Sequence, residues 1–325
     1  MKGFTWGMGG MLLAAGLLVT GCTKNESQVD SAAPLGVTNE VQAMQNLAVS
    51  DAFVQNDELT IADQSIQTFN YGTFGKVDAA ITPLRWGRFV TGVTKTVTTT
   101  TAPGDTISTA VVEKLITGTL KIQGKTGVGD TVVISKPFTD KSTRTIVFRR
   151  VGKNTRTFWL NWVPVASTLV VGGTFPTPAN NGITLTKLEF FLPSGDTITV
   201  SDPANFYLRY QWLSWFHGGR KNLPMLNGGD AVDLRATVVS SSPDTDLVAL
   251  RYGFDMMHRR RAMMTMTSQV KNPDNTYTRE FDLKWNVHFH RGDFNAAVDA
   301  VTKATLFDDS APYSVSWWGV PYRVN

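Results

Sequence analysis

The feature that most constrains the fold is a succession of short β-branched runs that begins near Lys76 and continues to the end of the chain. Val, Ile and Thr dominate these runs, and Gly, Pro, Asn and Asp separate them at short intervals. Apolar residues at helical spacing are absent from the same region. This pattern is typical of antiparallel sandwiches, so we expect an all-β protein. Hydrophobic residues make up 42% of the chain and charged residues 18%, which suffices for a substantial core.

Three Gly-Asp pairs mark turns in this region. Each pair stands directly before a β-branched segment, at Gly104-Asp105, Gly129-Asp130 and Gly195-Asp196. The first pair predicts a hairpin between a strand ending near Thr101 and one starting at Ile107. Calcium binding by these aspartates is a weaker interpretation, because the dense carboxylate clustering of a calcium site is absent.

Two β-sandwich domains are expected, divided near Asp202-Pro203-Ala204-Asn205. The N-terminal sandwich would cover 76–202 and the C-terminal sandwich 203–325. About seven strand-like runs follow the boundary, Ala231–Ser240 among them, and this number resembles an immunoglobulin or fibronectin type III domain. The resemblance is one of pattern and lacks the cysteine–tryptophan–cysteine arrangement of antibody domains.

A short helix is expected ahead of the sandwiches. Val41, Met44, Leu47 and Ala48 recur at three- and four-residue spacing within Asn39–Val54, which predicts an amphipathic helix. The rest of 37–75 is polar and weakly patterned. We therefore expect 37–75 to form a short helical or irregular segment ahead of the sandwiches.

The first residues have the pattern of a secretory signal. Lys2 precedes the apolar run Met11–Leu18, which is too short to span a membrane, and the run leads into Val19-Thr20-Gly21-Cys22. That tetrad resembles the lipobox of bacterial lipoproteins. The resemblance implies a signal peptide at 1–21, diacylglycerol on the Cys22 sulfur, and cleavage before Cys22. The polar segment 22–36 would then be a flexible tether.

The lipobox also implies a location. An acylated Cys22 would hold the protein on a lipid bilayer, and Thr23 in place of an Asp after the cysteine favours the bacterial outer membrane, facing either the periplasm or the exterior. Cys22 is the only cysteine, so no disulfide is expected. The net charge of +4 is too mild to suggest nucleic acid as a partner. A glycan or another envelope protein are the remaining candidate partners.

Aromatic residues near the C-terminus are candidates for ligand binding. Trp317 and Trp318 are neighbours, and neighbours in a strand point to opposite faces. One indole must therefore enter a second layer or reach solvent. Together with Tyr313 and Tyr322, an exposed indole would suit stacking on sugar rings. Burial against a neighbouring domain is the alternative that we favour.

Two polar groups offer weaker candidates. Arg259, Arg260 and Arg261 form a basic cluster that could bind anionic glycans or lipid headgroups, although a solvated loop explains it more simply. His288 and His290 share one face of a predicted strand and are a weak candidate for a metal site. Their face is otherwise polar, which favours ordinary surface residues.

No motif for catalysis or for a cofactor is present. The sequence lacks a Gly-x-Ser-x-Gly elbow, a His-Glu-x-x-His helix and a P-loop. We therefore expect no cofactor and no enzyme, with a glycan-active hydrolase built from two distant acids as the alternative. The working hypothesis is a lipid-anchored envelope protein that acts as a binding or structural module. A carbohydrate-binding module and a filament subunit that assembles by strand addition are its two alternatives.

Overall fold

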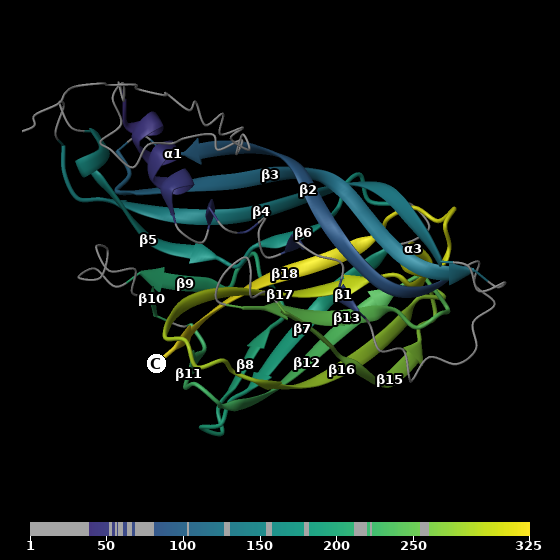
Figure 1. The fold of residues 1–325 in the computed structure, drawn as a ribbon. Coiled ribbons are helices and arrows are strands. Elements are labelled where there is room, and N and C mark those ends of the chain that lie inside the picture. Colours follow the sequence, from purple (N-terminus) through teal and green to yellow (C-terminus); the bar gives the residue numbers. More distant parts are fainter. Residues whose placement is uncertain are drawn as a thin grey trace, which may run out of the picture.

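The computed structural model describes residues 39–51, 54–55, 57, 61–63, 67–68, 81–102, 104–126, 131–153, 158–178, 182–210, 220–221, 223–253 and 260–325. The expected signal peptide, Cys22 and the tether lie outside the described residues, as does Arg259. Within the described part, two sheets with almost entirely antiparallel pairing dominate (Figure 1). The all-β expectation is confirmed. Among the same residues, no helix combines the length and the apolar character needed to cross a bilayer.

The two sheets contain all the described strands. The smaller sheet consists of β7 (Ile183–Phe191), β8 (Thr197–Val200), β12 (Ala231–Ser240), β15 (Thr265–Lys271) and β16 (Tyr277–Asn286). The larger sheet consists of β1 (Gln67–Thr68), β2 (Ile81–Thr100), β3 (Ile107–Thr126), β4 (Thr131–Arg150), β5 (Trp162–Thr168), β6 (Val171–Thr174), β9 (Tyr207–Tyr210), β10 (Arg220–Lys221), β11 (Met225–Leu226), β13 (Leu247–Tyr252), β14 (Arg260–Met263), β17 (Gly292–Val301) and β18 (Val315–Val324). Short helices are α1 (Glu40–Ser50), η1 (Phe158–Leu160) and α3 (Lys303–Phe307).

Helix α1 confirms the expected amphipathic segment. The side chain of Asn39 caps its start by accepting a hydrogen bond from the Gln42 amide at 2.9 Å. Ala43, Met44 and Ala48 are its buried residues, and Met44 and Ala48 belong to a core that also contains residues of β3, β4 and β5. Of the four residues that the spacing placed on one face, Met44 and Ala48 are buried and Leu47 is partly buried, whereas Val41 is 46% exposed, so the predicted face is only partly correct.

Strands β2, β3 and β4 are each 20 residues long and lie side by side (Figure 1). The turn at Gly104, which has φ of 84°, joins β2 to β3 and confirms the predicted hairpin. β3 and β4 run unbroken. The sequence pattern predicts shorter strands there, at Ile107–Ile116 and Thr119–Gln123 in the first and at Thr131–Lys136 and Thr143–Val151 in the second. Gly118 lies inside β3 without interrupting it. A Cβ at this position would lie 2.3 Å from the Phe89 carbonyl oxygen, so the neighbouring strand leaves no room for a side chain. This glycine permits a close approach of backbones inside the sheet.

The pairing of strands does not follow the expected division after 202. The smaller sheet has the order β15-β16-β12-β7-β8, and the main path of the larger sheet runs β1-β2-β3-β4-β6-β18-β17-β13-β14. Both sheets therefore combine strands from both sides of that boundary. The physical reason is hydrogen bonding across the expected boundary. β7, before it, pairs with β12, after it, and β6 pairs with β18 in the same way. The chain does not form one separate sandwich before 202 and another after it.

Strand β18 separates two hydrophobic cores. Trp318 lies in the core that packs the smaller sheet against β13, β17 and β18. Trp317 lies in a second core, formed by the opposite face of these strands and the long strands β2 to β4. The prediction that the two indoles enter different layers is confirmed. A third core lies under α1 and includes Phe148 and Trp162.

The larger sheet curls so that its two ends approach each other. Arg261 on β14 donates a hydrogen bond to the Trp86 carbonyl on β2 at 3.2 Å. Residues 61–63 lie between these ends: the Asp63 amide donates to the Arg88 carbonyl at 2.7 Å, and Arg251 on β13 donates to the Ile61 carbonyl at 3.0 Å. A segment that precedes the sheet in sequence thus bridges its two ends.

Candidate functional site: a buried cluster of ion pairs

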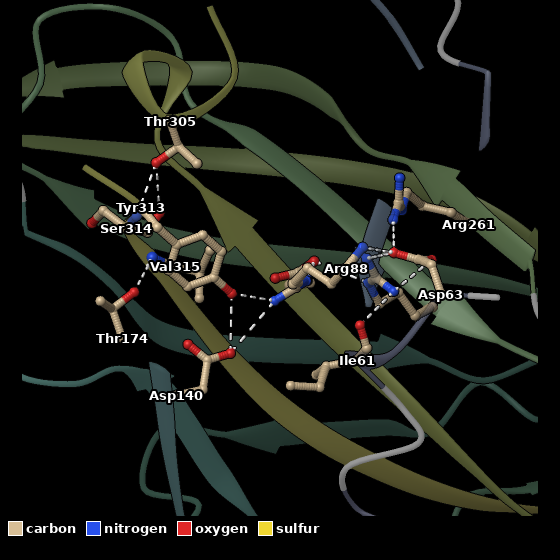
Figure 2. Close-up of polar contacts among 12 residues, drawn as sticks. Ile61, Asp63, Arg88, Asp140, Thr174, Arg261, Thr305, Tyr313, Ser314 and Val315 are labelled. Atoms are coloured by element: carbon tan, nitrogen blue, oxygen red, sulfur yellow. Dashed lines mark hydrogen bonds and ion pairs between the residues drawn. The ribbon is translucent and has the colours of Figure 1, made fainter. Parts of the chain in front are cut away.

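Charged side chains converge inside the curled sheet. We call this group the charge cluster, and it consists of Asp63, Arg88 on β2, Asp140 on β4, Arg251 on β13, Arg261 on β14, Asp299 on β17 and Tyr313 just before β18. Strand alternation positions them: Arg88 follows Trp86 by two residues, and Asp140 follows Phe138 by two. Trp86 and Phe138 belong to the second core, so these polar residues occupy positions that face a core. Figure 2 shows polar contacts of the cluster.

Arg88 is the centre of one half of the cluster. Its side chain is fully buried and forms an ion pair with Asp299. It also donates to the Tyr313 hydroxyl at 3.0 Å, and that hydroxyl donates to Asp140 Oδ2 at 3.0 Å (Figure 2). The Arg88 guanidinium lies 3.8 Å from the same Asp140 oxygen. Tyr313 thus links the two charged groups.

Asp63 is the centre of the other half. Arg251 holds its carboxylate in a bidentate arrangement, with both N–O distances at 3.0 Å. Arg261 donates to the same carboxylate at 2.7 Å, and the Arg88 backbone amide donates to it at 2.8 Å. The Arg261 guanidinium lies 3.5 Å from the centre of the Trp86 ring. Arg251 connects the halves, because its Nε donates to Asp299 at 3.0 Å.

Burial and neighbouring charges shift the pKa values in opposite directions. Burial raises the pKa of Asp63, but Arg251 and Arg261 outweigh it and hold the pKa below its usual value. For Asp140, burial dominates and raises the pKa to about 7, because Arg88 offsets it only in part. Burial lowers the pKa of Arg261 to about 9, with Arg251 acting in the same direction. Asp140 is therefore the member that exchanges its proton near neutral pH.

The cluster is suited to holding segments together. Its three guanidinium groups and three carboxylates pair with one another, and each side chain is almost fully buried. A catalytic acid or base must contact its substrate, whereas these groups contact each other. The arrangement joins residue 63 to the long strands and to β13, β14 and β17. Its direct chemical capacity is charge pairing and proton uptake at Asp140.

The predicted aromatic site is buried. Relative exposures are 0% for Trp317, 4% for Trp318, 5% for Tyr313 and 1% for Tyr322, so the exposed aromatic row expected as one alternative does not form. The physical reason is that β18 has core on both faces. The four residues are buried, as the favoured alternative expected, but in cores formed by strands of the two sheets and not against a separate domain.

The three arginines do not act as one basic loop. Arg260 is exposed on β14, whereas Arg261 points to the opposite face and enters the charge cluster. Arg259 lies outside the described residues. The basic site expected from adjacent arginines is therefore divided between solvent and core for the two that are described.

The two histidines lie near one another at the start of the loop after β16. Their ring centres are 5.9 Å apart, and His288 Nε2 lies 2.8 Å from the Tyr322 hydroxyl. His288 also packs edge-on against Phe294, so it is not the solvated residue that strand alternation predicted. Among the described residues, no set of three or more His, Cys, Asp or Glu side chains is arranged to hold a metal ion.

Sequence reasoning missed the charge cluster itself. Its one local signal is a charged residue two positions after a large apolar residue in a strand, as in Trp86 and Arg88. The partners are far apart in sequence: Asp299 lies 211 positions after Arg88, and Arg251 lies 188 positions after Asp63. Comparisons of this chain with protein-family models, with curated proteins and with solved structures give no match.

Proposed function

We propose that this chain is a lipid-anchored protein of the bacterial envelope, located at the outer membrane, whose folded body is a structural or binding module without catalytic activity. The lipobox-like tetrad ending in Cys22 supports the anchor. The charged groups of the charge cluster pair with one another. This supports a structural role for them, in which they hold segments of the body together.

One observation carries the proposal: the segment that follows the expected tether is fastened to the body at several points. Glu40 pairs with Arg150, Asp57 pairs with Arg144 at 2.8 Å, and Asp63 enters the charge cluster. A protein that hangs from its first residues needs such fastening, because any pull on the anchor reaches the body through this segment. The contacts are what a permanently tethered module requires.

We further propose that β7 and β12 to β18 form an immunoglobulin-like sandwich. Support comes from the strand order, in which β15-β16-β12-β7 lies on one side and β18-β17-β13-β14 on the other. The first four correspond to the ABED sheet of that fold, with β7 as strand A, and β18, β17 and β13 correspond to its CFG sheet, with β14 as an additional edge strand. The unit would then begin at Ile183 and would carry β2, β3 and β4 as an extension of its second sheet.

Neither alternative function has a specific observation in its favour. The aromatic residues assigned to carbohydrate binding are buried. The C-terminal strand assigned to filament assembly pairs with β17 of the same chain over ten residues and also contacts β6. Its hydrogen-bonding edges are therefore used within its own sheet.

The substitution Cys22→Ser tests the anchor. In the native bacterial host, the variant should lose palmitate labelling and leave the membrane fraction, because the acylated sulfur is gone. Lys24→Ser, two residues further on, is the matched control and should label normally. Equal labelling of the Cys22→Ser and unaltered proteins would refute lipid anchoring.

A further inference from the structure

The lead, by which we mean the described residues between 39 and 63, contacts the body through groups from five strands. The Gln45 side chain donates to the Val97 carbonyl on β2 at 3.1 Å, and Lys114 on β3 donates to the Val54 carbonyl. Arg144 on β4 pairs with Asp57, and β13 and β14 supply the guanidinium groups around Asp63. These contacts resemble those between a protein and a bound peptide more than those between strands of one sheet.

The interface between lead and body is desolvated. Ala43, Met44, Ala48, Val54 and Ile61 each have at most 1% of their surface exposed. The Arg144–Asp57 pair is almost fully buried, with side-chain exposures of 2% and 3%. Removing one member of such a pair would leave an uncompensated buried charge. The body is therefore complementary to the lead in both shape and charge.

The contact at Asp63 has the form of a carboxylate receptor. Arg251 and Arg261 approach the carboxylate from two strands, and the Arg88 amide approaches it from a third. Asp299 fixes the Arg251 guanidinium, and the Trp86 ring supports that of Arg261. Because these donors are already held in place by other groups, they lose little side-chain conformational entropy when they bind a carboxylate.

We propose that the body binds the lead as a ligand, with Asp63 as its principal anchoring group, so that the two stay associated after the chain is cut between residue 63 and β2. The proposal concerns an interaction surface formed by β2, β3, β4, β13 and β14, and its partner is an acidic segment, the lead itself. Its biological consequence rests on the proposed function: a lipidated lead would keep the body on the membrane without a continuous chain.

The test uses a chain that begins at Cys22, is expressed without lipidation and carries a fluorophore on that thiol. A protease recognition sequence within a glycine–serine linker is inserted between Ser65 and Ile66, so that β1 stays with the body, and cleavage is driven to completion. In gel filtration at low ionic strength, the labelled lead should elute with the body. A labelled lead that elutes alone would overturn the proposal.

The role of Asp63 is tested by the rate at which the labelled lead leaves the cut protein. Asp63→Asn should raise the dissociation rate roughly tenfold or more, because loss of one member of a buried charge pair acts mainly on dissociation. Gln55→Ala is the matched control, since Gln55 is an exposed residue of the lead, and its rate should not change. Equal rates for Asp63→Asn and the parent would refute the carboxylate receptor.

A competition experiment covers the case in which Asp63→Asn does not fold. An excess of an unlabelled peptide spanning 39–66 should displace the labelled lead from the cut parent protein, and the same peptide with Asn at 63 should compete at least about tenfold less well. Equal competition by the two peptides would refute the role of Asp63. Failure of palmitate labelling at Cys22 would remove the anchor and leave these results intact, so the two proposals fail separately.

Discussion

Asp140 should make the stability of this protein fall as the pH rises toward neutrality. Its carboxyl is fully buried, with Oδ2 contacted by Tyr313 and Arg88. Burial raises its pKa from 3.8 to about 7. The native state therefore keeps a proton that the unfolded chain releases near its ordinary pKa. Because the native state binds more protons in this interval, the free energy of unfolding must decrease with increasing pH.

The magnitude follows from the two pKa values. Each pKa unit corresponds to about 1.36 kcal/mol, so the interval from 3.8 to about 7 sets a ceiling of about 4 kcal/mol. Between about pH 5 and about pH 7 the loss should be about 2 kcal/mol. The amide in Asp140→Asn cannot ionise and can still accept the Tyr313 hydrogen bond. This variant should lack that part of the pH dependence.

The assay is urea unfolding followed by tryptophan fluorescence at constant ionic strength. It measures the free energy of unfolding of both proteins at several values from about pH 5 to about pH 8. The unaltered protein should lose more stability over this range than Asp140→Asn. Asp246, whose pKa burial raises to about 6, contributes a slope of the same sign in both proteins and therefore cancels from the comparison. Parallel curves for the two proteins would refute the assignment of a buried, protonated Asp140.

Three further perturbations test the packing. Trp285→Asp places a charge at a site with 3% exposure and should abolish cooperative melting. Lys284→Asp, on the exposed face of the same strand, should leave melting nearly unchanged. Equal melting temperatures for the two variants would contradict the assignment of buried and exposed faces in β16. Deleting Trp317–Asn325 should leave insoluble or protease-sensitive protein, and a soluble truncation with a sharp melting transition would contradict the place of β18 in the sheet. Gly172→Ala should lower the melting temperature, because its Cβ would lie 2.2 Å from the Trp317 ring, whereas Gly182→Ala has open space and should not.

Strand alternation predicted individual elements well where the core-facing residues are apolar. The predicted run Ala231–Ser240 coincides with β12, whose inward residues include Val232, Leu234 and Val238. In β4 the inward positions include Lys136, Asp140 and Arg144. Because these inward residues are charged, the sequence does not alternate between apolar and polar residues along the middle of β4. The sequence pattern therefore predicts two shorter strands in place of one. The charge cluster is difficult to recognise in the sequence for the same reason, because its charged residues occupy core-facing positions where apolar residues are expected.

Membership of the sheets was not predictable from alternation. The pattern of a strand identifies its buried face but carries no information about which neighbour it bonds to. Turn residues at 202–205 indicated a domain boundary, yet β7 before them and β12 after them are adjacent in the smaller sheet. Contacts between such distant segments depend on the whole topology, and the ion pairs of the charge cluster are of the same kind.

The two adjacent indoles on β18 have a consequence for how the body unfolds. Trp318 belongs to the core against the smaller sheet and Trp317 to the core against the long strands, so one strand is shared by both. Neither core can lose its packing while β18 remains ordered for the other. The body should therefore melt in a single calorimetric transition, with its van't Hoff and calorimetric enthalpies in agreement. Mechanically, the smaller sheet and the core against the long strands would give way together.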